Sequence, residues 1–472
     1  MEESSLFAIN RTKQLLPALT PRPFAGRKSY GVRAAPGKSF LSRGNASGKR
    51  RLRIALYSHD TMGLGHKRRN LLIAQALGDS DINADILMIS GMRDASDVPT
   101  PEGVDYLTLP ALYKRADGQY QSRRLRLVLE EMIQLRSQLI CTAIKNFQPD
   151  VLIVDNVPRG AVRELDPTLE YVKSQPHIHC ILGLRDVLDT RAAVQRDWQR
   201  ADSEAAIRRY YETIWVYGDS DIYDIRAEYG LPADITAKMH PLGYLDQRAR
   251  LRHTSPAVRS SLESLRLPKD NLVLCLVGGG QDGVALATAF AQATFPSDTT
   301  GVLLTGPFMP PEIQQQLHHW ATTNPQLHIL DYFEEPTLLI EQASRVVAMG
   351  GYNTTCEILS FQKPALIVPR VTPRLEQWIR AERLQQMGLV DVLHPDRLSP
   401  ETVSTWLHQP IDTNPVRPTV NLNGLDNLLV ALKQVLMAAL LRDDALPSHA
   451  SSHTGQTASL TSHPSTFLPC YR

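Results

Sequence analysis

Two segments of this sequence place reactive side chains next to glycine-rich turns. The first, SHDTMGLGH, ends at His66, and imidazole is the side chain best suited to accept a proton near neutral pH. The second, MGGYNTTCE, contains Gly350 and Gly351 and ends at Glu357, whose carboxylate could accept hydroxyl groups of a ligand. Because glycine lets the backbone approach a ligand closely, Gly63 and Gly65 in the first segment belong to the same kind of candidate site.

Each segment also has a purely structural explanation. Asn353 or Thr354 is a good helix N-cap, and Thr354-x-x-Glu357 fits a capping box in which the glutamate satisfies a backbone N–H. A glycine turn followed by a histidine is also common in ordinary loops. Spacing alone leaves both explanations of Glu357 open.

A third glycine turn, GGGQDG, follows an apolar run at residues 271–277 and precedes a predicted helix from Val284. It matches the dinucleotide fingerprint G-x-G-x-x-G, which requires an acidic residue about 20 residues later, at the end of the next strand. That strand, residues 301–304, ends in Thr305-Gly306-Pro307-Phe308 without an acid. We therefore predict a diphosphate cradle rather than a dinucleotide site, formed by Gly278, Gly279, Gly280 and Gln281.

Strands that alternate with helices are expected on both sides of a polar connection at residues 253–267. Before it, apolar runs predict strands at residues 52–57, 84–89, 105–109, 150–154, 178–184 and 213–217, with helices at 67–77 and 124–147. This alternation indicates a parallel sheet. Asp155, Asp186 and Asp219 each follow a strand, where an aspartate either caps a helix or faces a ligand.

The second half repeats the order of strand, glycine turn and helix. Strands are predicted at residues 271–277, 301–304, 327–330, 346–349, 365–368 and 389–393. Tyr332 and Phe333 follow one of them and could stack on a base or pack in the core. A later helix carries Glu376, Gln377 and Arg380.

These elements predict an α/β protein of two doubly wound, Rossmann-like domains, at residues 51–250 and 268–420, facing one another across a cleft. A helix at residues 421–442 is expected to pack back on the first domain. Residues 1–50 hold ten Lys or Arg against two acids and predict a disordered basic tail, with an organelle transit peptide or a mis-called start left open. Residues 443–472 are rich in Ser, Thr and His and predict a second disordered tail.

The segment from Ser344 to Leu384 resembles the donor-binding segment of glycosyltransferase family 28, whose members have the two-domain GT-B fold. The residues that carry the resemblance are Gly351, Thr354, Glu357, Pro369 and Gln377. The likeness is clearest over residues 271–392 and weaker at residues 61–66. Met349-Gly350 stands where the family has Arg-Ser, Glu376 replaces the first of two Gln, and Arg380 replaces an Asn, so the sugar and the acceptor cannot be carried over.

The resemblance implies an inverting, metal-independent hexosyltransferase that needs no cofactor and uses a nucleoside-diphosphate sugar, with UDP the expected nucleotide. Glu357 would hold the ribose, Gln377 the sugar, and Tyr332 or Phe333 the base. His66 is the predicted base for the acceptor hydroxyl, with Asp186 orienting or replacing it and His59 or Asp60 less favoured. Two other functions stay open: a non-hydrolysing UDP-sugar epimerase, and an inactive nucleotide-sugar-binding protein.

The charge and cysteine content of the sequence limit which binding partners and which cellular location we expect. A formal net charge of +2 with 21% charged residues gives no argument for nucleic-acid binding. The five cysteines form no metal-binding or disulfide pattern, which suits a reducing, cytoplasmic location. Basic residues cluster at Lys114-Arg115 and Arg123-Arg124-Arg126, which predicts either a solvated surface or contact with a phosphate or an anionic membrane. The acceptor, a lipid or a secondary metabolite, stays open.

Overall fold

The computed structural model describes residues 51–59, 65–91, 100–115, 119–268, 270–411 and 418–444. The predictions for residues 1–50, for Asp60 and Gly63, and for the tail from residue 445 fall outside these ranges. The residues from Arg51 onwards cluster as a single compact unit that contains two parallel sheets.

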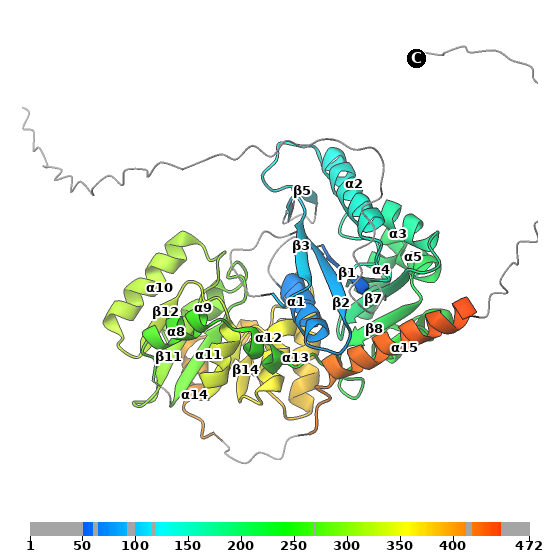
Figure 1. Cartoon of the computed structure of the whole chain (residues 1–472). Coiled ribbons are helices and arrows are strands. Elements are labelled where there is room, and N and C mark those ends of the chain that lie inside the picture. Colours follow the sequence, from blue (N-terminus) through cyan, green and yellow to red (C-terminus); the bar gives the residue numbers. More distant parts are fainter. Residues whose placement is uncertain are drawn as a thin grey trace, which may run out of the picture. The chain divides into compact units, whose positions relative to one another are not determined.

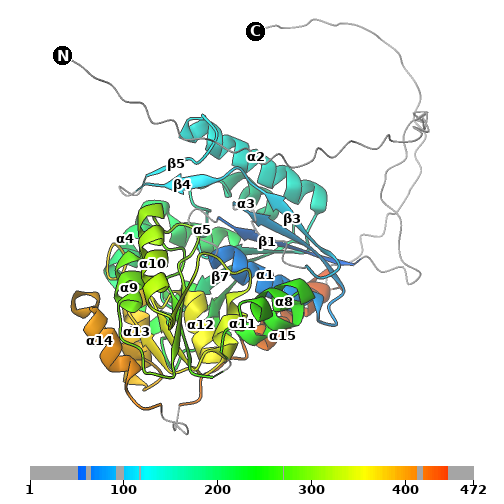
Figure 2. The ribbon, with the colours of Figure 1, turned by 90° about the vertical axis from the view of Figure 1, so that its left-hand side faces the viewer.

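The N-terminal sheet has the order β3-β2-β1-β6-β7-β8-β9, and all its neighbouring strands are parallel. A separate antiparallel hairpin, β4-β5, lies beside the start of α2 (Figure 2). The strands are β1 (Leu52–Ser58), β2 (Ala84–Ser90), β3 (Val104–Thr108), β4 (Leu112–Lys114), β5 (Tyr120–Ser122), β6 (Val151–Asp155), β7 (His179–Arg185), β8 (Thr213–Tyr217) and β9 (Met239–Pro241).

The C-terminal sheet has the order β12-β11-β10-β13-β14-β15 and is also entirely parallel. Its strands are β10 (Leu272–Leu276), β11 (Thr300–Leu304), β12 (Leu327–Leu330), β13 (Arg345–Ala348), β14 (Ala365–Ile367) and β15 (Asp391–Val392). The α/β class and the two doubly wound sheets predicted from the sequence are thereby confirmed (Figure 1).

Helices connect the strands of both sheets. In the N-terminal half these are α1 (Gly65–Gly78), α2 (Leu129–Phe147), α3 (Asp166–Lys173), α4 (Arg191–Ala201), α5 (Ser203–Tyr210), α6 (Ile225–Tyr229) and α7 (Ala233–Thr236). After β9 come the 3-10 helix η1 (Gln247–His253), then α8 (Pro256–Ser264), α9 (Val284–Ala291), α10 (Pro311–Thr323), α11 (Pro336–Gln342), α12 (Tyr352–Ser360), α13 (Glu376–Gln386), the 3-10 helix η2 (Pro395–Arg397), α14 (Pro400–Leu407) and α15 (Gly424–Asp444).

The central strands are buried on both faces, as parallel strands covered by helices must be. Every residue of β6, β8 and β10 is buried, which explains why their sequences read as continuous apolar runs. Two of these three strands end in a polar or hydroxyl-bearing residue, Asp155 and Tyr217. Asp155 and Tyr217 therefore place polar groups at the carboxyl ends of β6 and β8.

Both sheets reverse their strand order beside their first strand. In the N-terminal sheet β2 and β3 lie on one side of β1 and β6 on the other; in the C-terminal sheet β11 and β12 lie on one side of β10 and β13 on the other. Helices after neighbouring strands diverge at such a point, and open α/β sheets bind ligands there. The three glycine turns singled out in the sequence follow β1, β10 and β13, so all of them lie at these two switch points.

Three sequence expectations need correction. Helix α2 begins at Leu129 rather than near Arg124, after the β4-β5 hairpin that the sequence did not suggest. Most of the connection at residues 253–267 is helix α8, started by Ser255 as N-cap and Pro256. Strand β9 was also not expected, because three residues are too few to show a pattern.

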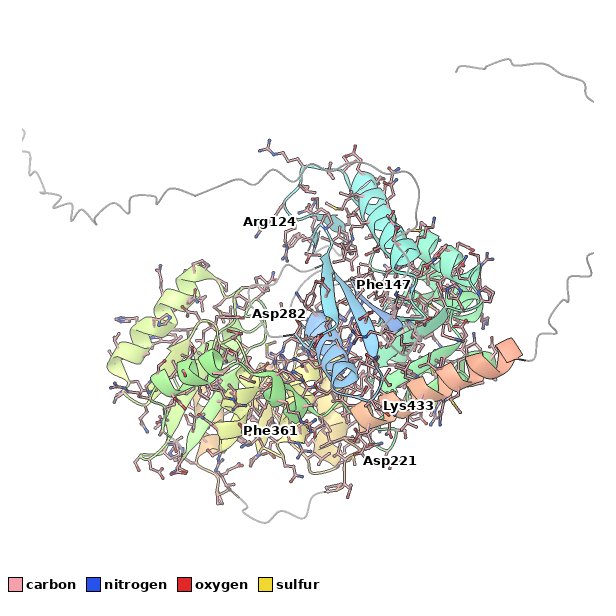
Figure 3. All side chains as sticks on the ribbon, viewed as in Figure 1. Arg124, Phe147, Asp221, Asp282, Phe361 and Lys433 are labelled. Atoms are coloured by element: carbon pink, nitrogen blue, oxygen red, sulfur yellow. The ribbon has the colours of Figure 1, made fainter. Side chains whose placement is uncertain are left out.

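The last helix, α15, lies against the N-terminal half. Leu245 and Asn423 form an antiparallel bridge just before the helix, and the side-chain amide of Asn427 donates to the carbonyl of Leu242 at 2.7 Å. Lys433, labelled in Figure 3, forms an ion pair with Asp81. The chain thus returns to its first sheet after completing the second.

Candidate functional site

The GGGQDG turn after β10 can only be made by glycines. Gly278 and Gly280 have φ angles of 64° and 96°, in the left-handed region that other residues rarely adopt. A Cβ on Gly280 would lie 2.4 Å from the carbonyl oxygen of Thr305, whereas one on Gly278 would meet nothing within 4 Å. The turn is therefore packed on one side and open on the other, and it leads into α9, whose first N–H groups have no side-chain cap.

The Gly350–Gly351 turn after β13 leads directly into α12. Gly350 has a φ of 72°, and a Cβ there would lie 2.6 Å from Ile367, while Gly351 has open space around it. Gly351 is itself the N-cap, without a side-chain hydrogen bond to the helix start. The expectation that Asn353 or Thr354 caps this helix is wrong, and the capping-box explanation of Glu357 falls with it, because Thr354 already lies inside the helix.

Glu357 is almost fully buried and contacts the N-terminal half. Its Oε1 accepts hydrogen bonds from Arg68 Nη2 at 3.0 Å and from Thr337 Oγ1 at 3.1 Å. Neither contact uses Oε2, which has no partner among the described residues. Burial raises the pKa of Glu357, and Arg68 opposes that increase only in part. A carboxylate with a free oxygen in such a place gains from an added hydrogen-bond donor.

Arg68 joins two carboxylates. Its Nη2 lies 3.0 Å from Oε1 of both Glu335 and Glu357. The other oxygen of Glu335, Oε2, forms an ion pair with Arg250 at 2.7 Å. Burial raises the pKa of Glu335, but Arg250 and Arg68 outweigh burial and lower it to about 2. The charges in this cluster are therefore compensated, and Glu335 stays ionised.

Of the two aromatic residues proposed as a platform for a base, the structure favours Tyr332. Phe333 is 8% exposed and packs in the core, whereas the side chain of Tyr332 is 44% exposed just beyond β12. Tyr332 also contributes, after Glu357 and Glu335, to raising the pKa of Arg68.

Arg370 joins Glu376 and Gln377 to the GGGQDG turn. Its guanidinium forms ion pairs with Asp282, in the GGGQDG turn (Figure 3), at 2.9 Å and with Glu376 at 2.7 Å. Its backbone N–H donates to Gln377 Oε1 at 2.9 Å, which fixes the orientation of that amide. Glu376 Oε2 is buried without a protein hydrogen bond, and Gln281 is exposed at the end of the turn. Glu376 and Gln281 therefore have polar atoms that remain available to a ligand.

His66 stands at the start of α1 and is bonded to Asp155 at the end of β6. Its Nδ1 lies 2.5 Å from Asp155 Oδ2, and Arg69, one helical turn later, binds both oxygens of the same carboxylate. Burial alone raises the pKa of Asp155, but Arg69 and then His66 outweigh it and hold the pKa well below its ordinary value. An ionised Asp155 accepts the Nδ1 proton of His66, and in the neutral form of that tautomer Nε2 carries the lone pair.

His59 is the other histidine at this edge. Its ring lies 4.4 Å from that of His66, and its Nδ1 is buried without a hydrogen-bond partner among the described residues. Burial first, and then the charge of His66, lower the pKa of His59 well below its ordinary value. His59 is therefore neutral near pH 7.

Asp186 was expected beside His66, but the structure gives it other partners. Its carboxylate forms a two-pronged ion pair with Arg380 of α13, at 2.7 and 2.8 Å, and accepts a hydrogen bond from Tyr244. Burial lowers the pKa of Arg380, but Asp186 outweighs it and raises the pKa above its ordinary value. Asp186 thus joins the two halves, and Asp155 is the aspartate that meets His66.

Further contacts bring the two glycine turns of the first and second halves together. The side-chain amide of Asn353 in α12 donates to the backbone carbonyl of Gly65 at 2.9 Å, and the hydroxyl of Tyr352 donates to the carbonyl of Tyr217. Thr354 is half-buried in α12. The helix after the second turn therefore lies against the start of α1, next to His66.

Sequence reasoning missed Asp155, Arg68 and Arg370 as site residues. The position of Asp155 at the end of a predicted strand pointed to a site residue, but Asp186 and Asp219 stand at the ends of predicted strands as well. The structure separates them: Asp219 accepts backbone N–H groups of Asp221 and Asn421 and acts as a structural cap.

Among the described residues, no helix combines the length and the apolar character needed to cross a membrane. The same residues include no group of three His, Cys, Asp or Glu side chains arranged to hold a metal ion.

Comparison with known proteins identifies a family for part of this chain. Residues 273–415 match the glycosyltransferase family 28 C-terminal domain. Over 83 residues the chain is 32% identical to an uncharacterized glycosyltransferase of Methanopyrus kandleri, a match that covers 18% of this chain and 24% of that protein. Over 95 residues it is 32% identical to UDP-N-acetylglucosamine–N-acetylmuramyl-(pentapeptide) pyrophosphoryl-undecaprenol N-acetylglucosamine transferase 1 of Bacillus thuringiensis, covering 19% and 26%. The chain thus spans about a quarter of the length of either relative.

Similar solved structures cover nearly the whole described chain. The UDP-glucose complex of the Medicago truncatula protein UGT71G1 has a TM-score of 0.54 at 13% identity, covering 82% of this chain and 98% of that one. UDP-GlcNAc 2-epimerase of Methanocaldococcus jannaschii has a TM-score of 0.53 at 13% identity, covering 82% and 100%. The chain therefore has the GT-B fold of glycosyltransferases, and its residues 273–415 form a glycosyltransferase family 28 C-terminal domain.

Proposed function

We propose that this protein is an inverting glycosyltransferase that moves a hexosyl group from a UDP-sugar to a hydroxyl acceptor. The observation that carries the proposal is the His66–Asp155 pair at the switch point of the first sheet. It lies against the helix that follows the second glycine turn. A proton acceptor and a phosphate-binding turn are the two parts that such a transfer requires.

In the proposed reaction, Nε2 of His66 takes the proton of the acceptor hydroxyl. The acceptor oxygen attacks the anomeric carbon of the sugar from the face opposite the diphosphate. The bond from that carbon to the diphosphate oxygen breaks, and UDP leaves with the electron pair. The positive imidazole that results is stabilised by the carboxylate of Asp155.

The charge that develops on the leaving diphosphate would be stabilised by backbone N–H groups of the GGGQDG turn and by the start of α9. These groups are fixed before the reaction, so the proposed mechanism calls for no bound metal or other cofactor. Tyr332 would contact the base, Glu357 the ribose, and Glu376 with Gln377 the sugar.

The role of Glu357 can be tested apart from its ion pair. Glu357→Gln should raise the Kd for UDP by about tenfold, the scale of one charge-assisted hydrogen bond. Arg68→Met removes the ion pair but leaves the carboxylate, and it should change the Kd much less. Isothermal titration of both variants decides between the roles, because equal losses would mean that Glu357 acts only by holding Arg68.

An epimerase acting on a UDP-sugar is the second candidate, since a UDP-GlcNAc 2-epimerase is as similar in fold as the glycosyltransferases are. Incubation with UDP-sugars separates the two functions. UDP release that depends on an added acceptor supports the transferase. A changed sugar with no added acceptor supports the epimerase, and UDP-sugar binding without either reaction supports an inactive binding protein.

The acceptor side borders a surface suited to an anionic membrane. Arg124 (Figure 3) and Arg126 are exposed, and Leu125 and Val128 between and beside them are 49% and 61% exposed. Basic and apolar side chains in alternation favour binding at a lipid interface. We expect Arg124→Glu with Arg126→Glu to reduce binding to vesicles containing phosphatidylglycerol by about tenfold or more, at roughly 1 kcal/mol for each lost positive charge. Equal sedimentation with neutral and anionic vesicles would refute this contact.

A further inference from the structure

Four adjacent strands of the N-terminal sheet end in polar groups that have no hydrogen-bond partner among the described residues. In the order of the sheet, β1, β6, β7 and β8 are followed by or end in a residue with a buried, unbonded polar atom. These atoms are His59 Nδ1, Asn156 Oδ1, Arg185 Nε and Tyr217 Oη. Because buried polar groups are nearly always hydrogen-bonded, four in a row along one edge mark a place that a polar ligand completes.

Arg185 is the charged member of this row. It is the last residue of β7, two positions beyond Gly183, which pairs with Asp155 in the sheet. Its side chain is partly buried and makes no hydrogen bond or ion pair with any residue that the structure describes. A guanidinium donates in a planar fork that fits a phosphate or a carboxylate, and nothing here fills that fork.

The other charges at this edge are balanced in pairs. Arg69 is bonded to Asp155, and Arg380 is bonded to Asp186. Burial, followed by the like charges of Arg69 and Arg380, lowers the pKa of Arg185 to about 10, so it remains a cation at pH 7. Arg185 is thus a surplus positive charge beside the paired charges of Arg69 and Asp155.

Two described carboxylates, Asp155 and Glu376, act favourably on the charge of Arg185, and Asp155 is already bonded to Arg69, which leaves Glu376 as the alternative partner. Its charge acts favourably on Arg185, but it forms its ion pair with Arg370, and no ion pair joins it to Arg185. Glu376 Oε2 and Arg185 Nε are both buried without protein hydrogen bonds. These two groups are close enough for their charges to interact, and each has a buried polar atom without a hydrogen bond among the described residues, so one ligand can contact both.

We propose that Arg185 binds an anionic group, a phosphate or a carboxylate, of the substrate beside His66. The identification of that substrate as the acceptor rests on the proposed function. Arg185 belongs to the sheet that carries the base, whereas the glycine turns for the donor diphosphate follow β10 and β13 of the other sheet. The acceptor class is therefore a hydroxyl compound with a phosphate or carboxylate near the reacting hydroxyl.

The test measures inorganic phosphate binding by isothermal titration, with and without saturating UDP, to the wild-type chain, Arg185→Gln and a matched control. The control is Arg252→Gln, which alters an exposed arginine for which the described structure also shows no ion pair. Wild type should bind phosphate in the presence of UDP, Arg185→Gln should bind it about tenfold more weakly, and Arg252→Gln should match wild type. Unchanged UDP affinity in Arg185→Gln identifies the acceptor as the source of the anion.

If UDP displaces phosphate and Arg185→Gln weakens UDP instead, Arg185 is still an anion site, but the donor diphosphate supplies the anion. Equal affinity of wild type and a folded Arg185→Gln for both ligands overturns the proposal.

A second experiment uses the wild-type chain and so does not depend on the folding of a variant. Phosphate should slow the modification of Arg185 by phenylglyoxal, measured by peptide mass spectrometry, and should leave the modification of Arg252 unchanged. Absence of that protection also overturns the proposal. None of these readouts requires transferase activity, so a failure of the proposed function would be seen separately.

Discussion

Replacing His66 by alanine should lower kcat by about 10² to 10⁴ while the Kd for UDP stays nearly unchanged. The reason is that the proposed base contacts the acceptor hydroxyl and not the donor, whose phosphate-binding turn belongs to the other sheet. Steady-state kinetics and titration with UDP measure the two quantities independently. The acidic limb that a histidine base gives to the profile of kcat/KM against pH should disappear in the same variant.

Asp155→Asn provides the companion variant, because Asp155 is a positioning residue that acts through His66. An asparagine can no longer stabilise a charged imidazole, so kcat should fall by about tenfold or more, while acceptor KM changes little. If His66→Ala weakens UDP binding and leaves kcat within a few-fold of wild type, His66 is a donor ligand and not the base. If the acidic limb survives in His66→Ala, another group at this edge accepts the proton.

Breaking the pair of Asp186 and Arg380 should destabilise the protein by about 3 to 5 kcal/mol, the range for removing one member of a buried ion pair. Both side chains are almost fully buried, and Asp186→Asn would leave the Arg380 charge with a hydrogen bond but no counter-charge. Urea unfolding followed by circular dichroism gives the free energy of unfolding.

Glu228→Gln is the matched control, since Glu228 and Arg383 also join the two halves but are 36% and 40% exposed. An exposed pair contributes about 0 to 1 kcal/mol, so this variant should unfold close to wild type. If Asp186→Asn is as stable as wild type but has lost turnover, the prediction is wrong, and Asp186 has the catalytic role expected from the sequence.

Secondary structure could be read from the sequence where the signal is local. The apolar runs that form β6 and β10 are continuous because both faces of these strands are buried, and two of the glycine turns are visible because Gly280 and Gly350 adopt positive φ where a Cβ would clash. Short elements without a pattern were missed, among them the β4-β5 hairpin and β9.

The start of α12 shows the limit of local rules. Asn353 and Thr354 have the composition of an N-cap, but the turn at Gly350 is tight enough that the helix begins with Tyr352. Asn353 instead uses its amide to hold the backbone of Gly65, a contact between residues 288 positions apart in the chain. No window of sequence around Asn353 contains that information.

The sequence by itself determined which residues lie at the carboxyl ends of strands, and with them the set of candidate histidines, aspartates and glycines. Only the tertiary structure decided which of them meet. Strand β6 lies next to β1, so Asp155 reaches His66, whereas β7 lies one strand further and Asp186 meets Arg380 of the other half. The order of strands in a parallel sheet is set by how the helices pack on its faces, which is a property of the whole chain, and it left Arg185 without a hydrogen bond or ion pair among the described residues.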